Sequence, residues 1–128
     1  MSSEIEQLSG ADAWLLLATT SIGRLALCTD DGPDIFPVNF LASNGVIYFR
    51  SAPGSKLMEL TAQNAVAFQA DGKRRFKNWS VVVHGQAQRM DIDAEIEASG
   101  VRELETATPT EKWNYVRIIP AAVTGRRF

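Results

Sequence analysis

Residues 79–90 read Trp79-Ser80-Val81-Val82-Val83-His84-Gly85-Gln86-Ala87-Gln88-Arg89-Met90. The run is rich in valine and predicts a long β-strand, because branched and aromatic residues fit a pleated, half-buried surface. Gly85, inside the run, indicates a β-bulge or a close approach of another backbone. Further strands are predicted on both sides of this one.

Shorter strand-like runs lie on both sides of it. We predict strands over residues 23–29, 34–42, 46–51, 65–71 and 114–119. Pro120 is expected to end the last strand, and residues 71–75 are expected to form a turn or loop. The turns Asp30-Asp31-Gly32-Pro33 and Ser43-Asn44-Gly45 separate the first three strands, which should therefore pair antiparallel in chain order. Six or seven short strands with few helices predict a mainly β domain, a closed or nearly closed antiparallel barrel.

Three segments are predicted to be helical. Residues 10–17 follow Ser9, a suitable N-cap, and carry Asp12 in the first turn, so this helix should cover one end of the barrel. Residues 55–63 place leucines on one face, and residues 93–104 are acidic with a helical pattern.

Length and composition fit a single domain over residues 1–128. Hydrophobic residues make up 45% and charged residues 22%, which are ordinary values for a globular chain and argue against disorder. The net charge of −2 argues against a broad nucleic-acid surface, so any anion site must be local. The acidic start Met1-Ser2-Ser3-Glu4-Ile5-Glu6 is unlike a signal peptide, and the longest apolar run, residues 14–18, is too short to cross a membrane. A cytoplasmic location is expected.

The single cysteine and the single histidine give no chemical signal. Cys28 excludes a disulfide within one chain and a cysteine metal cluster, and we expect it to be a small buried residue of its strand. His84 lies on the valine-rich strand, where a packed or hydrogen-bonded side chain is favoured over a catalyst. One histidine with scattered carboxylates does not supply a ligand set, so no metal site is predicted.

The stretch Tyr48-Phe49-Arg50-Ser51-Ala52-Pro53-Gly54-Ser55-Lys56-Leu57 has the chemistry of a phosphate-monoester site. A strand delivers Arg50 and Ser51 into a Pro-Gly turn, and Ser55 and Lys56 follow at once. A guanidinium offers a planar fork to phosphate oxygens, an ammonium adds a compact charge, and hydroxyls complete the shell. A helix starting at Ser55 would point its N-terminal amides at the same anion. The alternative is a polar hairpin loop with solvated charges.

Several motifs follow one another in a recognisable order. They are Gly23-Arg24-Leu25, Pro37-Val38-Asn39-Phe40, Phe49-Arg50-Ser51 with Gly54-Ser55-Lys56-Leu57, Phe68 with Asp71, residues 79–87, and the closing Val123-Thr124-Gly125-Arg126-Arg127. Together they resemble the pyridoxamine 5'-phosphate oxidase-like family of flavin-binding split barrels, in its short members. The resemblance implies a six-stranded antiparallel split β-barrel that forms a homodimer and holds FMN in two grooves at the subunit interface. A two-fold contact would cover the apolar strand faces that a small, incompletely closed barrel exposes.

The resemblance also implies which residues bind the cofactor. They are Pro37, Val38, Asn39, Phe49, Arg50, Ser51, Ser55, Lys56, Leu57, Trp79 and Ser80. Arg50, Ser51 and Lys56 match the family's phosphate-binding positions. Residues 37–39 match the strand whose backbone runs along the isoalloxazine ring, and residues 79–80 match a strand that approaches the flavin from the partner subunit.

The reaction is less well defined than the cofactor. True pyridoxamine phosphate oxidases bind their substrate with the help of an Arg-rich, Trp-containing C-terminal segment that ends in Arg-Leu-x-Pro. The sequence does not match that segment, so activity as a true pyridoxamine phosphate oxidase is not expected. The first hypothesis is an FMN-dependent oxidoreductase that passes electrons between a reduced donor and a small acceptor. The alternatives are a non-catalytic flavin-binding, storage or sensor module, and a reductase that uses a deazaflavin coenzyme. No catalytic residue is assigned.

Four residues and one basic segment have competing interpretations. Asn39 could hydrogen-bond the flavin or be a polar residue of a half-buried strand, and Trp79 could wall the ring or be a core or interface aromatic. Arg126 and Arg127 could reach the cofactor or the partner, or form a solvated tail. The basic residues between 73 and 77 fit a solvated loop, or they could attract a phosphorylated substrate.

Overall fold

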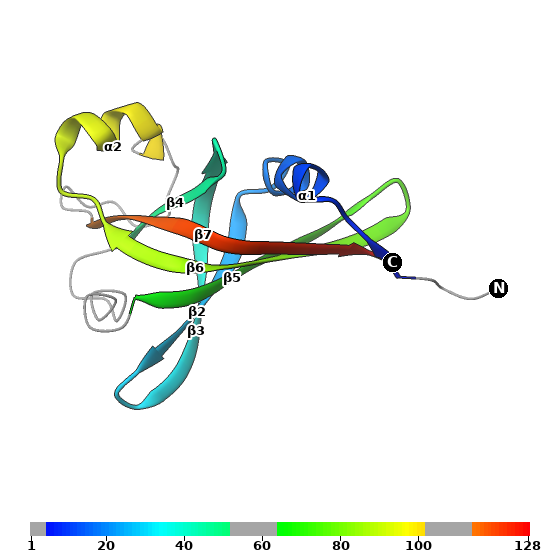
Figure 1. Ribbon diagram of the computed structural model, residues 1–128, viewed down its shortest axis with the longest axis horizontal. Helices are drawn as coiled ribbons and strands as arrows, with labels where there is room; N and C mark the ends of the chain where they lie inside the picture. The colour runs from blue at the N-terminus through cyan, green and yellow to red at the C-terminus, as the bar shows by residue number, and fades with distance from the viewer. Residues whose placement is uncertain (1–4, 52–63, 102–113) are drawn as a thin grey trace.

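The computed structural model describes residues 5–51, 64–101 and 114–128, and in these ranges the chain forms an antiparallel β-barrel with two helices (Figure 1). The elements are β1 (Glu6–Gln7), α1 (Gly10–Leu17), β2 (Ile22–Thr29), β3 (Gly32–Ser43), β4 (Val46–Ser51), β5 (Ala65–Arg74), β6 (Lys77–Arg89), α2 (Asp93–Ser99) and β7 (Asn114–Arg127). The strand order is β1-β7-β4-β3-β2-β5-β6, and a further pairing of β6 with β7 closes the barrel. Six strands form the closed ring, and the two-residue β1 pairs with the end of β7. The predicted mainly β antiparallel barrel is confirmed.

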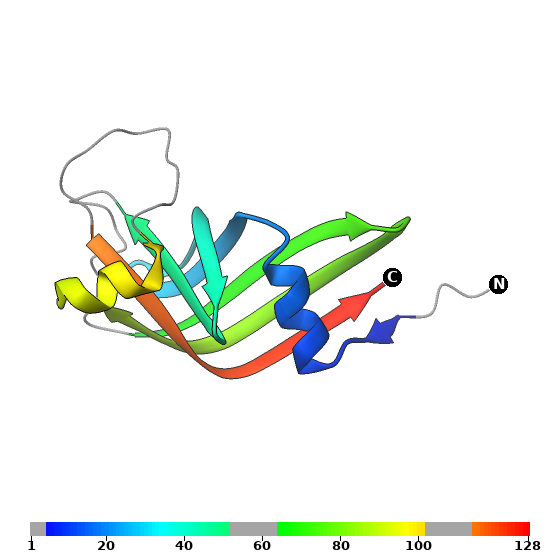
Figure 2. The same cartoon turned by 90° about the horizontal axis from the view of Figure 1, so that it is seen from above.

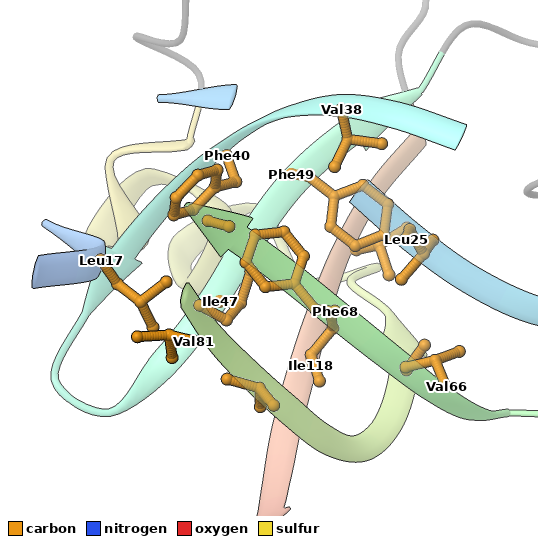
Figure 3. Close-up of a cluster of buried hydrophobic side chains, with 14 of the residues drawn as sticks. Leu17, Leu25, Val38, Phe40, Ile47, Phe49, Val66, Phe68, Val81 and Ile118 are labelled. Atoms are coloured by element: carbon orange, nitrogen blue, oxygen red, sulfur yellow. The ribbon is translucent and has the colours of Figure 1, made fainter. Parts of the chain in front are cut away.

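The core fills the inside of the barrel because side chains alternate between its two faces. On β5, for example, Val66, Phe68 and Ala70 are buried. Figure 3 shows Phe40, Phe49 and Phe68 pointing toward one another among Leu25, Ile47 and Ile118. The Phe40 and Phe68 rings meet edge to face, with centroids 4.7 Å apart and planes at 67°, a geometry that aromatic quadrupoles favour.

Helix α1 forms where the sequence predicts it. The Ser9 side chain accepts a hydrogen bond from the Asp12 backbone N–H at 3.1 Å, which confirms the predicted N-cap. Ala13, Leu16 and Leu17 are buried and belong to the main core. Figure 2 shows α1 lying across β6 and β7, the two strands against which it packs most extensively.

The β6–β7 pair contains the irregularity that Gly85 predicts. The register shifts between His84 and Gly85, so that Gly85 faces Pro120 while His84 faces Ala122. A Cβ atom on Gly85 would lie 2.3 Å from the Ile119 carbonyl oxygen, which confirms the close backbone approach. The prediction that Pro120 ends the last strand is wrong, since β7 continues to Arg127. Proline is tolerated here because the bulge already interrupts the ladder of hydrogen bonds.

Two other boundaries differ from prediction by three residues or more. Strand β5 does not end at Asp71 but continues to Arg74, because the pairs from Asp71–Ser80 to Arg74–Lys77 extend the β5–β6 hairpin. Helix α2 is shorter than residues 93–104, because Gly100 adopts φ 79° and caps it. The Asn-Gly hairpin turn is confirmed, with φ 52° at Asn44 and 73° at Gly45. The predicted helix over residues 55–63 lies outside the described residues.

The predicted burial of Cys28 is wrong, and His84, which was expected to be packed or hydrogen-bonded, is not packed in the core. Cys28 is exposed, because the alternation of β2 turns Leu25 and Leu27 inward and Cys28 outward. His84 is exposed for the same reason, next to the inward-facing Val83. In the described part of the chain, neither helix is long and apolar enough to cross a membrane.

Candidate functional site

The outward-facing side chains of five neighbouring strands form a polar surface, which we call the outer polar face. Its members are Pro37 and Asn39 on β3, Arg24 on β2, Gln69 and Asp71 on β5, Ser80 on β6, and Thr124 and Arg126 on β7. The strand register aligns Pro37 with Arg24 and Arg24 with Gln69. It also aligns Asp71 with Ser80 and Ser80 with Arg126. The predicted residues Pro37, Asn39 and Ser80 are therefore brought to one surface.

Hydrogen bonds fix the centre of this face. Arg24 Nη1 donates to Gln69 Oε1 at 3.3 Å and to Asp71 Oδ1 at 3.2 Å. Gln69 Nε2 donates to Asp71 Oδ2 at 3.0 Å and to Ser80 Oγ at 3.3 Å. Gln69 thus connects β2, β5 and β6 across the surface. Such a network holds polar groups in one arrangement before any ligand binds.

The same contacts set the charge state of Asp71. The hydrogen bond from Gln69 is the largest influence and lowers the Asp71 pKa below its usual value of 3.8. Partial burial acts in the opposite direction, and the hydrogen bond and charge of Arg24 add to the lowering. Asp71 is therefore ionised at neutral pH, where it balances Arg24.

Arg50 and Ser51 lie at the end of β4, next to this surface. The β3–β4 pairing ends at Phe40 and Phe49. Asn39, before Phe40, and Arg50, after Phe49, are the next positions beyond that pair, and both are on the outward side of their strands. Ser51 points to the inner side and is only 5% exposed, and its Oγ has no hydrogen-bond partner among the described residues. A buried hydroxyl without a partner costs about 1–3 kcal/mol. The end of β4 thus offers a half-buried guanidinium and an unused hydroxyl.

Three predicted residues turn their side chains away from this surface. Val38, Phe49 and Trp79 are 8%, 0% and 3% exposed and belong to the main core. Trp79 is therefore a core aromatic within this chain, which was one of its two interpretations. These three can offer a ligand their backbone but not their side chains. Ser55, Lys56 and Leu57 lie outside the described residues.

A cavity borders the outer polar face at its β7 edge. It has a volume of about 590 Å³, and its lining includes Thr124 and Arg126 together with Ile5, Gln7 and Leu8. Arg126 therefore belongs to the outer polar face. Arg127 points to the other side of β7, and its Nη1 lies 3.6 Å from Glu6 Oε2. The described ranges contain no cluster of three or more His, Cys, Asp or Glu side chains that could hold a metal ion.

Sequence reasoning missed the residue at the centre of the face, Gln69. The signal was available, since Gln69 lies between Phe68 and Ala70, where period-two alternation turns it outward. Arg24 and Asp71 were part of the quoted motifs but had no assigned role. Their pairing depends on the β2–β5 register, which chain order does not reveal.

Comparisons with known proteins identify the family of the chain. Residues 9–127 match the family model for pyridoxamine 5'-phosphate oxidase. An uncharacterized protein of Mycobacterium tuberculosis is 44% identical over 87 residues, which cover 64% of this chain and 74% of that protein.

Two solved structures also resemble the chain over nearly its whole length. A Corynebacterium glutamicum protein, named as a candidate pyridoxamine 5'-phosphate oxidase, is 40% identical with a TM-score of 0.87 and coverage of 98% of both chains. The FAD-binding protein of Mycobacterium smegmatis is 36% identical with a TM-score of 0.82, and the match covers 96% of this chain and 98% of that one. The predicted split β-barrel fold is confirmed. The chain belongs to the pyridoxamine 5'-phosphate oxidase family.

Proposed function

We propose that the chain binds a flavin, and specifically FMN, with the phosphate at the end of β4 and the ring along the outer polar face. The observation that carries the proposal is the buried, unused hydroxyl of Ser51 next to Arg50. Membership of the family and the 36% identical FAD-binding protein of Mycobacterium smegmatis support a flavin as the ligand.

The residues present fit the two ends of this cofactor. Arg50 would pair with the phosphate, and Ser51 would donate its proton to a phosphate oxygen beyond the strand end. Asn39 and Gln69 carry amides that can hydrogen-bond a ring edge, with Gln69 already oriented by Asp71 and Ser80. Ser55, Lys56 and Leu57 are proposed to complete the phosphate site, and a partner subunit would bring its own Ser80 strand to the ring in a homodimer.

The activity we propose is that of an FMN-dependent oxidoreductase in the cytoplasm. A bound flavin supplies hydride or electron transfer, while the protein supplies position and electrostatics. A non-catalytic flavin-binding module is the second candidate, and one observation favours it. Asp71, a carboxylate of the outer polar face, is held ionised by Gln69 and Arg24, so it is a poor proton donor at neutral pH.

The experiment begins with the purified full chain. The small molecule released on denaturation is identified by its mass and visible spectrum, and the expected result is FMN at about one per chain. Arg50→Ala should then weaken FMN binding by about 10- to 100-fold, the usual loss for a charge-assisted contact. Ser51→Ala should also weaken FMN binding, yet it should leave the FMN-free protein at least as stable, because it removes an unsatisfied buried hydroxyl.

Lys73→Gln is the control for the loss of one positive charge. Lys73 lies on the extended β5–β6 hairpin, and two strands separate β5 from β4, so Lys73 is remote from the proposed phosphate site. It should leave FMN affinity unchanged. A colourless protein that also takes up no added FMN would disprove the cofactor, and a deazaflavin would be recognised by its mass and absorbance. Steady oxidation of NADH or NADPH by the loaded protein would support the oxidoreductase, and no consumption with any donor would support the binding module.

A further inference from the structure

A second cavity, of about 580 Å³, lies between α1 and the outer ends of β5, β6 and β7. Its lining consists of Asp12, Leu15, Leu16, Thr19, Arg74, Arg75, Lys77 and Arg127. Figures 1 and 2 both show the β5–β6 hairpin continuing past α1 at this end of the molecule. The volume lies within the range of about 300–1,000 Å³ that small-molecule sites occupy. The cavity shares no lining residue with the outer polar face.

Strand register explains why cations line this cavity. On β6, Val81 and Trp79 point inward, so Lys77 is the next position on the same side. Arg74 pairs with Lys77, and Arg127 pairs with Trp79, which places both on that inner side as well. Positions that hold apolar side chains within the barrel are therefore cationic where the strands extend beyond it.

The charges in the cavity are largely uncompensated. Arg74, Arg75 and Lys77 make no ion pair within residues 5–51, 64–101 and 114–128, and Arg127 pairs with Glu6 at 3.6 Å. Among the described lining residues, Asp12 is the one carboxylate. Neighbouring cations repel one another, and a bound anion would relieve that repulsion.

Apolar groups form the opposite wall. Leu15 is 68% exposed and Leu16 lies beside it on α1. The turn between β5 and β6 is also unusual. Arg75 and Phe76 adopt φ 52° and 67°, although neither is glycine or asparagine. A left-handed conformation costs such residues about 1–2 kcal/mol each. Glycine or asparagine would therefore form this turn more favourably than Arg75 and Phe76 do. Strain of this kind is often kept where the residues serve a function.

We propose that this cavity binds an amphiphilic organic phosphate. Its phosphate would contact Arg74, Lys77 and Arg127, and its apolar body would pack against Leu15 and Leu16. The proposal is independent of the flavin assignment, because the two sites use different residues and opposite faces of the strands. The competing explanation is edge protection. Beyond the Arg24–Gln69 pair, no strand of the described ranges pairs with β5 on the β2 side, and cations on such an edge discourage aggregation.

The test uses the full chain and three probes, namely octyl phosphate, inorganic phosphate and octanol, measured by titration calorimetry. Octyl phosphate should bind at least tenfold more tightly than either of the other two, because only it engages both walls. Lys77→Gln should weaken octyl phosphate binding at least tenfold. Lys73→Gln, which removes the same charge from the outward side of the same hairpin, should change it less than twofold. Leu15→Ser should weaken binding of octyl phosphate but not of inorganic phosphate.

Several results would overturn the proposal. Equal affinity for the three probes, or an equal effect of Lys73→Gln and Lys77→Gln, would indicate bulk charge and edge protection. Binding to vesicles of phosphatidylcholine and phosphatidylglycerol without binding of octyl phosphate would indicate a membrane surface instead. Competition between octyl phosphate and FMN would place the ligand on the outer polar face. FMN uptake by Lys77→Gln is measured in parallel, so that unfolding of the variant and failure of the flavin assignment are both recognised.

Discussion

The sheet of β5, β6 and β7 has two faces that differ in how their charged and polar side chains are paired. On the outer polar face, Gln69 hydrogen-bonds both Asp71 and Ser80, and Arg24 balances the carboxylate. On the inner side, at the far end of the same strands, Arg74 and Lys77 lie in a cavity without ion pairs in the described part of the chain. The centre of one face satisfies its polar groups internally, while two cations of the other have no carboxylate partner among the described residues.

This difference shows how period-two alternation can place two binding chemistries on one hairpin. A satisfied network holds its amide and hydroxyl in fixed positions, which suits recognition of a rigid, planar ligand edge. Uncompensated cations offer less geometric control but a stronger attraction for an anion. The two faces should therefore respond to different mutations.

The largest effect is expected from Phe68→Ala, which removes a central side chain of the core on which both faces depend. Phe68 is fully buried and meets Phe40 edge to face, and its ring fills the space where Gly23 lacks a Cβ atom. Loss of such a side chain costs about 3–5 kcal/mol of the free energy of unfolding. Urea unfolding followed by fluorescence measures this loss, and binding of both FMN and octyl phosphate should weaken together.

Phe76→Ala is the matched control for that experiment. Phe76 is the same residue type but 97% exposed, so its truncation should change the free energy of unfolding by about 0.5 kcal/mol or less. Comparable losses for the two variants would mean that the Phe40–Phe68 layer does not hold the barrel together.

The next largest effect separates the two faces. Gln69→Ala removes the amide that connects Arg24, Asp71 and Ser80, so FMN affinity should fall about tenfold, which corresponds to roughly 1.4 kcal/mol. Octyl phosphate affinity should stay the same, because Gln69 does not line the cavity between α1 and the ends of β5, β6 and β7, which we call the inner cavity. Lys77→Gln should show the reverse pattern. If either variant weakened both ligands equally, the two faces would not be independent sites.

Sequence reasoning predicted the barrel because its signals are local. Alternation marks each strand, Asn44-Gly45 marks a hairpin with both residues at positive φ, and Ser9 marks the start of α1. The errors arose where a long-range contact overrides a local signal. Pro120 would normally end a strand, but it pairs with Gly85 at a bulge, and Asp71 would normally mark a turn, but Ser80 continues the ladder beside it.

The candidate site could be predicted only in part, for the same reason. Arg50 and Ser51 adjoin each other in the chain, so their chemistry is visible as a motif. The outer polar face joins residues 47 positions apart, as in the Arg24–Asp71 ion pair. The inner cavity depends on whether Lys77 points inward, and that follows from the register of the whole hairpin. Burial of Trp79 likewise became evident only once its strand was placed in the barrel.

A smaller effect on stability is expected at the tip of the β5–β6 hairpin. Phe76→Gly places the residue that best tolerates φ 67° at that position, so the protein should become more stable by about 1 kcal/mol. Gly45→Ala is the opposite control, because Gly45 has φ 73° with no atom near its missing Cβ, and it should destabilise by a similar amount. Thermal unfolding measures both. No gain from Phe76→Gly would show that the tip is not strained.

The smallest effect concerns pH and the outer face alone. The folded-state pKa of Asp71 lies below its usual value, chiefly because Gln69 donates a hydrogen bond to it, so the fold favours the ionised carboxylate. Stability from this shift is present above about pH 4 and is lost as the pH falls through the folded-state pKa. Asp71→Asn should therefore lower the melting temperature slightly at pH 6 and make no difference near pH 2. The effect is small because the Arg24 and Asp71 side chains are 41% and 52% exposed.

Asp31→Asn controls for the loss of one negative charge, since Asp31 lies on the exposed β2–β3 turn. A difference between wild type and Asp71→Asn that stayed constant from pH 6 to pH 2 would mean that Asp71 acts by packing and not by charge. The inner cavity should not respond to this substitution, because its cations face the other side of the strands. Octyl phosphate affinity at pH 6 should therefore be equal in Asp71→Asn and wild type. A change in that affinity would show that the charges of the two faces are coupled through the sheet.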